Sequence, residues 1–505
     1  MSLQRRLCVL AVTLALPAIL AGCSHVMLPN GGPPPPNNAP VILTMHDSNA
    51  PVSGVTVTSF EATVTGASLT PATGTPVALL STSQKIEFTQ LQTNSVYLST
   101  TQVAAGNYTS LTLTYSTPQY TIFNGTGASI TANGQTCGAA TECVIASPKV
   151  DAVTGTVTFS SPIVVQQSNQ TRIEADVNLN DLIQSTFDVD FSKSIAATVS
   201  QQTNAATPIG DPLQMSGQVG TITASTKQFQ LNTSAGQTFT ITADNGTLFQ
   251  FARANCTAND FTCIAAGQVL DLSVNIFGDG KTFEAGEVDF DDDASTQQVS
   301  GQIVAMNANP PTSFTMVVHN TIPGSTSLPV GSLATVTIGA SPSFVINNGS
   351  FVLPSSPILS FAATSDVIVG QEVEARVASG TTISNGAFTT NRLALEQTQL
   401  EATATNANAT AQPPQPSYAL TSSSSTNPLP SLFVDNPLGT VTQIQVLTVT
   451  QGSNTLTLFQ ALSPNSMGGV TSGTAVSTGG FLFNTPAVGS PTIVATVVRG
   501  EVSGT

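Results

Sequence analysis

The densest group of acidic side chains in this chain lies between residues 278 and 293. Its members are Asp279, Glu284, Glu287, Asp289, Asp291, Asp292 and Asp293. Side chains alternate along an extended strand, so Asp289, Asp291 and Asp293 are predicted to project to one face. Carboxylate oxygens are ligands that calcium prefers. The candidate calcium ligands are therefore Asp279, Glu287, Asp289, Asp291 and Asp293.

The acidic segment has a second interpretation that needs no metal. An EF-hand loop places acids at alternate positions, followed by a glycine and a distal glutamate, and this segment lacks that order. We therefore expect a solvated acidic strand edge, whose charge also discourages strand-to-strand aggregation. Bound calcium is kept as the alternative, and no other cofactor is expected.

Signatures of the common catalytic centres are missing from the sequence. The three histidines are His25, His46 and His319, and none has a second histidine at metal-ligand spacing. The chain contains neither a Gly-x-Ser-x-Gly elbow nor a phosphate-binding Gly-Lys-Ser/Thr motif. Two carboxylates distant in sequence suffice for glycoside hydrolysis, although the chain has no tryptophan to stack on a sugar ring. We expect a protein that is not an enzyme, with a carboxylate-dependent hydrolase as the alternative.

Four cysteines form two pairs of near neighbours, Cys137 with Cys143 and Cys256 with Cys263. Each pair is predicted to form a local disulfide that makes a hairpin or loop more rigid. The rival interpretation, a metal or redox pair, lacks nearby histidines and the two-residue spacing of zinc and thioredoxin motifs.

The N-terminus has the layout of a bacterial lipoprotein signal peptide. Arg5 and Arg6 precede an apolar run, and the sequence Leu-Ala-Gly-Cys at residues 20–23 matches a lipobox. Cleavage after residue 22 would leave Cys23 as the lipidated first residue, which anchors the chain to a membrane without spanning it. The alternative is an ordinary secretory peptide with Cys23 incidental. Ser24, where aspartate would signal inner-membrane retention, favours the outer membrane over the inner.

Composition and charge point to an exported β protein. Only 8% of residues are charged and the formal net charge is −16, and the predicted leader of residues 1–22 removes two arginines and no acid. Binding of nucleic acid or of anionic lipid heads needs clustered basic residues, so neither partner is expected. Residues 23–40, with four consecutive prolines, are predicted to be an extended tether behind the lipidated cysteine.

Residues 41–203 are predicted to form one β domain. Alternating apolar and polar runs at 55–60, 85–88, 111–115 and 153–165 are bounded by Gly, Pro, Asn or Ser, which is typical of a sandwich. Tyr108 lies just before the strongest alternating run. We expect its hydroxyl to return to the backbone at a strand corner.

Parts of this domain resemble a known family. The segments 55–64, 104–113 and 174–179, the second with a Gly-x-Tyr-Thr-x-Leu core, are similar to the family called domain of unknown function 4382. The resemblance covers about a third of the chain. It implies an exported β-sandwich and supplies no catalytic residues.

An internal repeat follows the first domain. Residues 216–222 recur at 300–306, and residues 267–271 recur at 370–374. Each copy contains a glycine-led strand and a Gly-Gln-x-Val or related strand, the rhythm of a small closed barrel. The copies at 213–294 and 298–400 resemble the exported module called domain of unknown function 5666.

The remaining chain is predicted to be a linker at 401–427, rich in Ala, Thr, Ser, Asn and Pro, and a divergent C-terminal β module at 428–505. The expected fold is thus all-β, with an N-terminal β-sandwich followed by two or three small β-barrel-like modules. The expected function is a bacterial cell-envelope lipoprotein that displays these modules to an envelope glycan or protein. A hydrolase of envelope polysaccharide and a calcium-stabilised adhesin are the alternatives.

Overall fold

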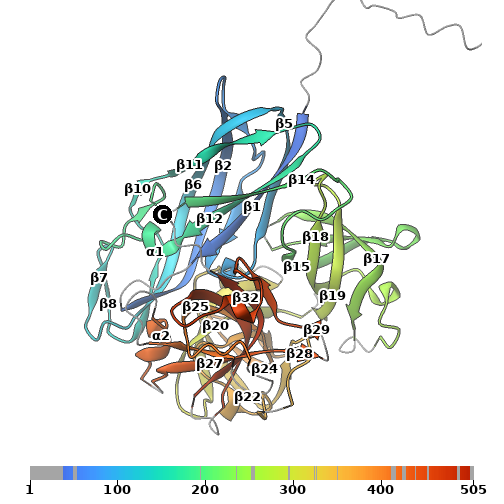
Figure 1. The fold of residues 1–505 in the computed structure, drawn as a ribbon. Helices are drawn as coiled ribbons and strands as arrows, with labels where there is room; N and C mark the ends of the chain where they lie inside the picture. Colours follow the sequence, from blue (N-terminus) through green and yellow to red (C-terminus); the bar gives the residue numbers. More distant parts are fainter. Residues whose placement is uncertain are drawn as a thin grey trace, which may run out of the picture. The chain divides into compact units, whose positions relative to one another are not determined.

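The computed structural model is built almost entirely of β-strands, which confirms the all-β prediction (Figure 1). The β-branched residues threonine, valine and isoleucine are frequent in the strands, because they suit a pleated and half-buried backbone. The structure describes residues 38–48, 54–193, 195–234, 236–251, 256–293, 296–322, 325, 327–349, 351–355, 357–410, 417–422, 428–437, 440–451, 454–485 and 490–500. No helix within these ranges is long and apolar enough to cross a membrane.

The N-terminal module is a sandwich of two sheets. The first sheet has the order β14 (Ile195–Gln202), β12 (Gln170–Asn178), β1 (Asn38–Ser48) and β5 (Val96–Ala104). The second has the order β11 (Thr154–Val165), β6 (Gly106–Asn124), β2 (Val55–Pro71) and β3 (Val77–Ala78). In the second sheet β4 (Gln84–Glu87) also pairs with β2, and β9 (Thr141–Ile145) also pairs with β6.

Aromatic side chains from different segments fill the core of the sandwich. The rings of Tyr115 and Phe191 stack with their centroids 4.2 Å apart, and Phe60 packs edge-on against Phe88 at 5.7 Å. Tyr108 donates a hydrogen bond to the carbonyl oxygen of Ala104 at 2.8 Å. The expected return of this hydroxyl to the backbone at a strand corner is confirmed.

The predicted tether overlaps the first strand and is wrong at its C-terminal end. β1 begins at Asn38, and Ala39 is fully buried in the sandwich core. Pro40 is tolerated because this end of β1 pairs only with β5, and the pairing with β12 starts at Val41. Proline has no backbone N–H to donate. At this end of β1 one side of the strand has no neighbour, so no donor is needed there.

Two five-stranded closed barrels follow, as the internal repeat predicts. The first consists of β15 (Leu213–Thr223), β16 (Gln228–Asn232), β17 (Thr238–Gln250), β18 (Gln268–Ile276) and β19 (Phe283–Asp293). The second consists of β20 (Gln298–Met306), β21 (Ser313–Ile322), β22 (Leu333–Ile346), β23 (Glu372–Val377) and β24 (Ala387–Leu395). In both, the fifth strand runs parallel to the third and lies between the third and the fourth. This order is that of the OB-fold, a five-stranded Greek-key barrel, and the fold alone does not assign a ligand.

The repeated glycine at the start of each barrel has a steric reason. A Cβ placed on Gly217 would lie 2.6 Å from the carbonyl oxygen of Asn232, and one on Gly301 would lie 1.9 Å from the carbonyl oxygen of Val317. The two strands therefore approach more closely than any other residue allows. This contact explains why the same glycine occurs in both copies.

The C-terminal residues repeat the same topology a third time. The ring consists of β25 (Gln397–Thr405), β26 (Tyr418–Thr421), β27 (Gln443–Thr448), β32 (Thr492–Gly500) and β31 (Ala475–Phe483). The parallel pairing of β27 with β32 and the antiparallel pairing of β31 with β25 close it. One further strand, β30 (Leu458–Gln460), pairs with β32.

The predicted boundaries around this third barrel are wrong. Its first two strands lie in residues 397–405 and 418–421, so the expected linker 401–427 contains barrel strands, and the second barrel ends before residue 400. Ala402, Ala404, Tyr418 and Leu420 are buried in its core. Small, uncharged residues resemble a linker in composition, yet here they face the inside of a narrow barrel.

Short elements connect the larger ones. Among the described residues, α1 (Leu179–Leu182) and α2 (Ser431–Val434) are α-helices of four residues each. The short strands are β7 (Ile130–Ala132), β8 (Gln135–Cys137), β10 (Val150–Ala152), β13 (Val189–Asp190), β28 (Thr450–Gln451) and β29 (Asn454–Thr455). Single 3₁₀ turns cover Phe88–Leu91, Ala224–Thr226, Phe261–Cys263, Thr364–Asp366 and Met467–Gly469.

Apolar side chains also join neighbouring modules. Tyr97 of the sandwich lies edge-on to Phe239 and Phe283 of the first barrel, with ring centroids 5.6 and 5.2 Å away. Phe481 and Phe483 of the third barrel belong to the core of the second. Residues 38–505 accordingly form one compact unit rather than a chain of separate domains.

Gly301→Ala should destabilise the second barrel, because the new Cβ would force β20 away from β21. We expect a loss of about 1–3 kcal/mol, measured as a lower urea midpoint. Gly286→Ala is the matched control, since a Cβ at this strand glycine would meet nothing closer than 3.6 Å. Equal midpoints for the two variants would contradict the steric explanation.

Candidate functional site

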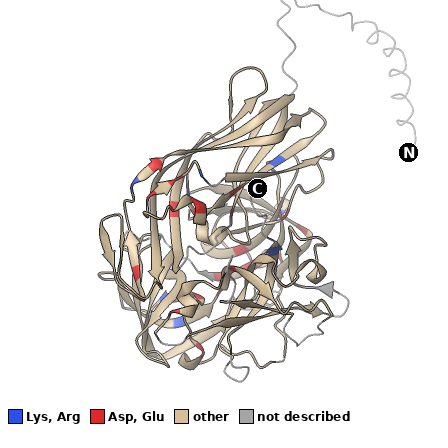
Figure 2. Cartoon of the chain, turned by 60° about the vertical axis from the view of Figure 1, so that its left-hand side comes forward, with Lys and Arg blue, Asp and Glu red and all other residues tan. Residues whose placement is uncertain are grey.

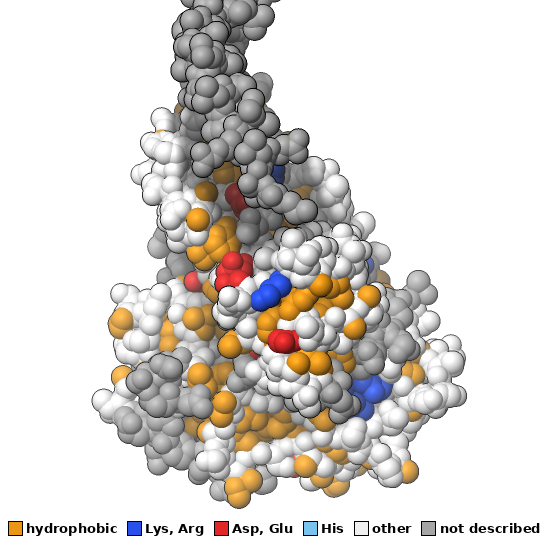
Figure 3. Space-filling view, turned by 90° about the vertical axis from the view of Figure 1, so that its right-hand side faces the viewer, with side chains coloured by type: hydrophobic (Ala, Val, Ile, Leu, Met, Phe, Trp, Pro, Cys, Tyr) orange, Lys and Arg blue, Asp and Glu red, His pale blue; other side chains and the backbone are white. Residues whose placement is uncertain are grey.

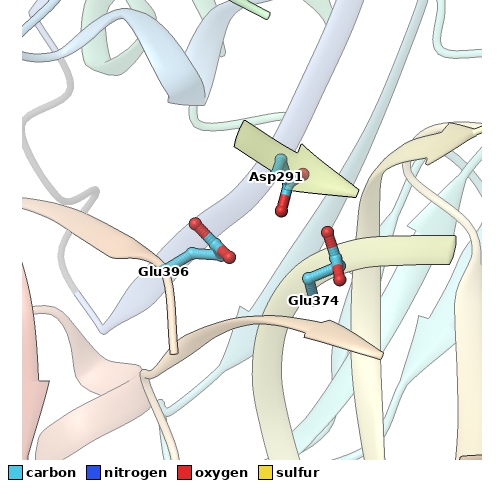
Figure 4. A group of neighbouring side chains, drawn as sticks. All are labelled: Asp291, Glu374 and Glu396. Carbon is cyan, nitrogen blue, oxygen red and sulfur yellow. The ribbon is translucent and has the colours of Figure 1, made fainter. Parts of the chain in front are cut away.

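The acidic segment of the first barrel meets two glutamates of the second. Asp291 lies on β19, Glu374 lies on β23, and Glu396 follows β24. One carboxylate oxygen from each lies within 4.8 Å of the other two, and the three side chains are turned toward one another (Figure 4). Asp291 is 8% exposed and Glu374 is 1% exposed, so the cluster is buried between the two barrels.

A segment of the second barrel enters this cluster. Asn347, directly after β22, directs its amide nitrogen to Glu396 at 3.0 Å and to Asp271 and Asp291 at 3.5 Å. Two residues later, a Cβ on Gly349 would lie 2.6 Å from a carboxylate oxygen of Asp289. The alternating acids of β19 thus face the second barrel.

The protein supplies part of the positive charge that these acids need. Arg392 on β24 donates to Glu374 at 2.8 Å. Two oxygens that share a calcium ion lie at most about 5 Å apart, because each Ca–O distance is about 2.3–2.6 Å. The oxygens of Asp291, Glu374 and Glu396 meet this limit, so these three carboxylates can hold such a cation.

Asp279 does not belong to this group, and the predicted five-residue ligand set is wrong. Its carboxylate accepts hydrogen bonds from the backbone N–H groups of Lys281 and Thr282 and from the Thr282 hydroxyl, at 2.9, 2.8 and 2.6 Å. Burial raises the pKa of Asp279, but these hydrogen bonds outweigh it and lower the pKa below the ordinary value. Asp279 lies in the turn between β18 and β19, whereas Asp291 lies near the far end of β19. A strand rises roughly 3.3 Å per residue, so most of the length of β19 separates the two carboxylates.

The expectation of a solvated acidic edge is also wrong for Asp291, because the second barrel covers this side chain. A strand pattern predicts which side chains share a face, and it does not show what packs on that face. Asp293 ends β19, but its side chain lies outside the described residues, as does Cys23.

Both predicted disulfides are confirmed. Cys137 is bonded to Cys143 with a Cα–Cα distance of 5.5 Å, and Cys256 is bonded to Cys263 with a Cα–Cα distance of 5.7 Å. Each closes a short loop inside one module. They stabilise local structure and do not join the modules to each other.

A buried histidine joins the sandwich to the second barrel. Nδ1 of His319 lies 3.0 Å from both carboxylate oxygens of Glu372, and Nε2 donates to the carbonyl oxygen of Thr58 at 2.8 Å. Burial alone would lower the pKa of His319, but Glu372, with a smaller contribution from Glu87, raises it to about 9. His319 is therefore the positive half of a buried ion pair.

A buried glutamate joins the sandwich to the third barrel. Glu174 on β12 accepts from Arg172 at 2.7 Å and from Arg499 of β32 at 2.6 Å. Arg172 also donates to the carbonyl oxygens of Ile209 and Asp211, on the segment that leads into the first barrel. Burial raises the pKa of Glu174, but the two guanidinium groups outweigh it and lower the pKa to about 2.

Sequence analysis did not find these junctions. His319 and Arg499 are each the one ionisable residue of their strand, and the segment that contains Glu174 supports a family resemblance without indicating a partner. The available signal is composition: in a chain with so few charges, a charged residue inside an apolar strand needs a partner. Figure 2 shows how sparsely charged residues are distributed over the described chain.

No family model matches this chain, and a comparison with curated proteins finds none that matches. The resemblances to domains of unknown function 4382 and 5666 therefore stay predictions. What the chain does must be argued from its own residues.

The ion pair of His319 should make stability depend on pH. The pKa of His319 is about 9 in the folded chain against an ordinary 6.5, so its stabilisation is complete below pH 6.5 and is lost as pH rises through 9. A shift of this size corresponds to a contribution on the order of 3 kcal/mol. We expect urea midpoints of the parent chain to fall over this range.

His319→Gln should be less stable at pH 6.5 and should show a flatter profile up to pH 9. Glu372→Gln is the matched partner variant, and it should flatten the profile as well, because its carboxylate raises the pKa of His319. An unchanged slope in both variants would show that another group causes the pH dependence.

Proposed function

We propose that this chain is a lipid-anchored protein of the bacterial cell envelope, without enzymatic activity, that presents a fixed assembly of β modules to an envelope glycan or protein. The observation that carries the proposal is the set of buried charged groups at the module junctions. Glu174 of the sandwich pairs with Arg499 of the third barrel, and His319 of the second barrel, which pairs with Glu372, donates to the carbonyl oxygen of Thr58 in the sandwich. Modules that are fixed against one another present a continuous surface in one geometry. Such a surface suits an extended partner, because little ordering is needed when the partner binds.

The disulfides support an extracytoplasmic location, because such bonds persist in oxidising compartments. The lipobox at residues 20–23 supports acylation of Cys23, and Ser24 favours the outer membrane. The tether that remains is residues 23–37, which precede β1.

The surface itself supports binding that does not depend on charge. The face in Figure 3 carries mostly uncharged polar and apolar side chains, with few acids or bases. Such a face offers hydroxyls, amides and apolar contacts to a neutral glycan or a protein. Clustered basic residues are what nucleic acid needs, and the net charge of −16 opposes that partner.

A hydrolase is the less favoured alternative. Its two carboxylates must flank a bond of the substrate. Asp291 and Glu374 are close together but buried between barrels, and Glu374 is paired with Arg392. The geometry supports a structural role for these acids better than contact with a polysaccharide.

A second candidate function is calcium-dependent stabilisation of the assembly. The observation that favours it is the approach of Asp291, Glu374 and Glu396 to within 4.8 Å. Since these residues come from both barrels, a shared cation would fasten one barrel to the other. This ligand set replaces the one expected from sequence.

Cys23→Ser should abolish incorporation of radiolabelled palmitate in cells and should release the protein or leave its precursor uncleaved. Cys8→Ser is the matched control, because Cys8 lies inside the apolar run of the leader and should not matter for acylation. Labelling that persists without Cys23 would end the anchoring proposal. Binding of the full-length chain to arrays of glycans and envelope proteins tests the other half, and hydrolysis of an arrayed glycan would contradict it.

Calcium should raise the melting temperature of the full-length chain more than magnesium does at matched ionic strength. A ligand at about 100 times its dissociation constant adds roughly 2.7 kcal/mol. The calcium response should vanish in Asp291→Asn and in Glu396→Gln. It should persist in Asp279→Asn, because the carboxylate of Asp279 accepts hydrogen bonds within the β18–β19 turn. Equal small shifts with both cations would show that only charge screening is at work.

A further inference from the structure

A cavity of about 360 Å³ lies where the second barrel meets the third. Met306 at the end of β20 and Val369 before β23 form its wall on one side. Phe433 of α2, Val441 and Asn484 form the wall on the other. Every described residue that lines the cavity is uncharged, in contrast to the charged junctions with the sandwich.

The walls of this cavity are held in place before any ligand binds. The ring of Phe433 packs directly on Gly370, where a Cβ would lie 2.0 Å from a ring carbon. Asn436 donates its amide to the carbonyl oxygen of Val304 at 3.2 Å, and Asn484 donates to Ser365 at 2.9 Å. Both amides reach from the C-terminal module to the second barrel, so the same contacts that join the modules shape the cavity.

The size of the cavity indicates how large a ligand it takes. Cavities that bind small molecules span about 300–1,000 Å³ and occur preferentially at domain interfaces. An apolar cavity of about 150 Å³ binds one benzene ring. The volume here therefore suits an apolar body of about two rings.

The lining indicates the charge of the ligand. Met306, Val369, Phe433 and Val441 offer apolar contacts, and Asn309 and Asn484 offer amide groups. A charged molecule would lose its hydration without meeting an opposite charge, which is unfavourable. A neutral molecule with a hydrogen-bonding group loses little on entry.

We propose that this cavity is a binding site for an uncharged small molecule with an apolar body of about two rings and one hydrogen-bonding group. The site lies between the second and third barrels and does not depend on lipidation. Failure of the membrane anchoring proposal would leave it standing.

The probe for this site is 1-naphthylamine, a neutral two-ring aromatic amine whose fluorescence depends on the polarity of its surroundings. The full-length chain should bind it saturably with a stoichiometry of one. 8-Aminonaphthalene-1-sulfonate carries the same ring system with a negative charge, and it should bind at least about tenfold more weakly, because its sulfonate finds no counter-charge.

Two pairs of matched variants locate the bound probe. Val441→Phe fills the cavity, whereas Val199→Phe makes the same change on the exposed face of β14. Val369→Asp places a charge in the wall with little change in size, whereas Val199→Asp makes that change on the exposed face of β14. Each cavity variant should weaken binding of the neutral probe at least about tenfold, and each surface variant should change it less than about twofold.

The proposal is overturned if the parent chain does not bind the neutral probe saturably, if the anionic probe binds as tightly, or if cavity and surface variants behave alike. Circular dichroism checks that each variant is folded. If Val441→Phe does not fold, the pair Val369→Asp and Val199→Asp decides the outcome alone.

Discussion

A single buried carboxylate, that of Glu174, is the contact on which the arrangement of the modules most depends. It lies between the guanidinium groups of Arg172 and Arg499, and Arg172 also binds the segment that enters the first barrel. Breaking a buried pair leaves an uncompensated charge and costs about 3–5 kcal/mol. Apolar contact alone would hold the modules together, but a buried ion pair also requires that they meet at one position.

A buried charged group also lies at the junction of the sandwich with the second barrel. Glu372 pairs with Nδ1 of His319 and, with a smaller contribution from Glu87, raises its pKa, and Nε2 donates to the backbone of the sandwich. The chain uses few charges, and several of them are placed between modules rather than on the surface. The junctions of barrel with barrel show two further solutions, the acidic cluster around Asp291 and the uncharged cavity beside Phe433.

These junctions connect the structure to the proposed functions. The sandwich, like each barrel, has its own apolar core, and the OB-like topology of the barrels assigns no ligand by itself. The acidic cluster around Asp291 and the cavity beside Phe433 both lie where two modules meet. A chain of separated modules would present neither site.

The sequence by itself determined the class of the fold and much of its local chemistry. Alternating runs and repeated glycines predict the sandwich and the first two barrels, and close cysteine pairs predict the disulfides, because these features depend on neighbours along the chain or on one strand. Cys23 as a lipid anchor is likewise a local prediction, and it stays one.

Only the tertiary structure decided which residues meet across modules. Glu174 and Arg499 are far apart in sequence, and Asp291 finds Glu374 and Glu396 rather than Asp279 because strand β19 separates the two ends of the acidic segment. Likewise, the alanines of the expected linker are buried because a narrow barrel interior selects small side chains. Side-chain alternation along a strand tells which face a residue occupies, whereas the partner on that face depends on how whole modules pack.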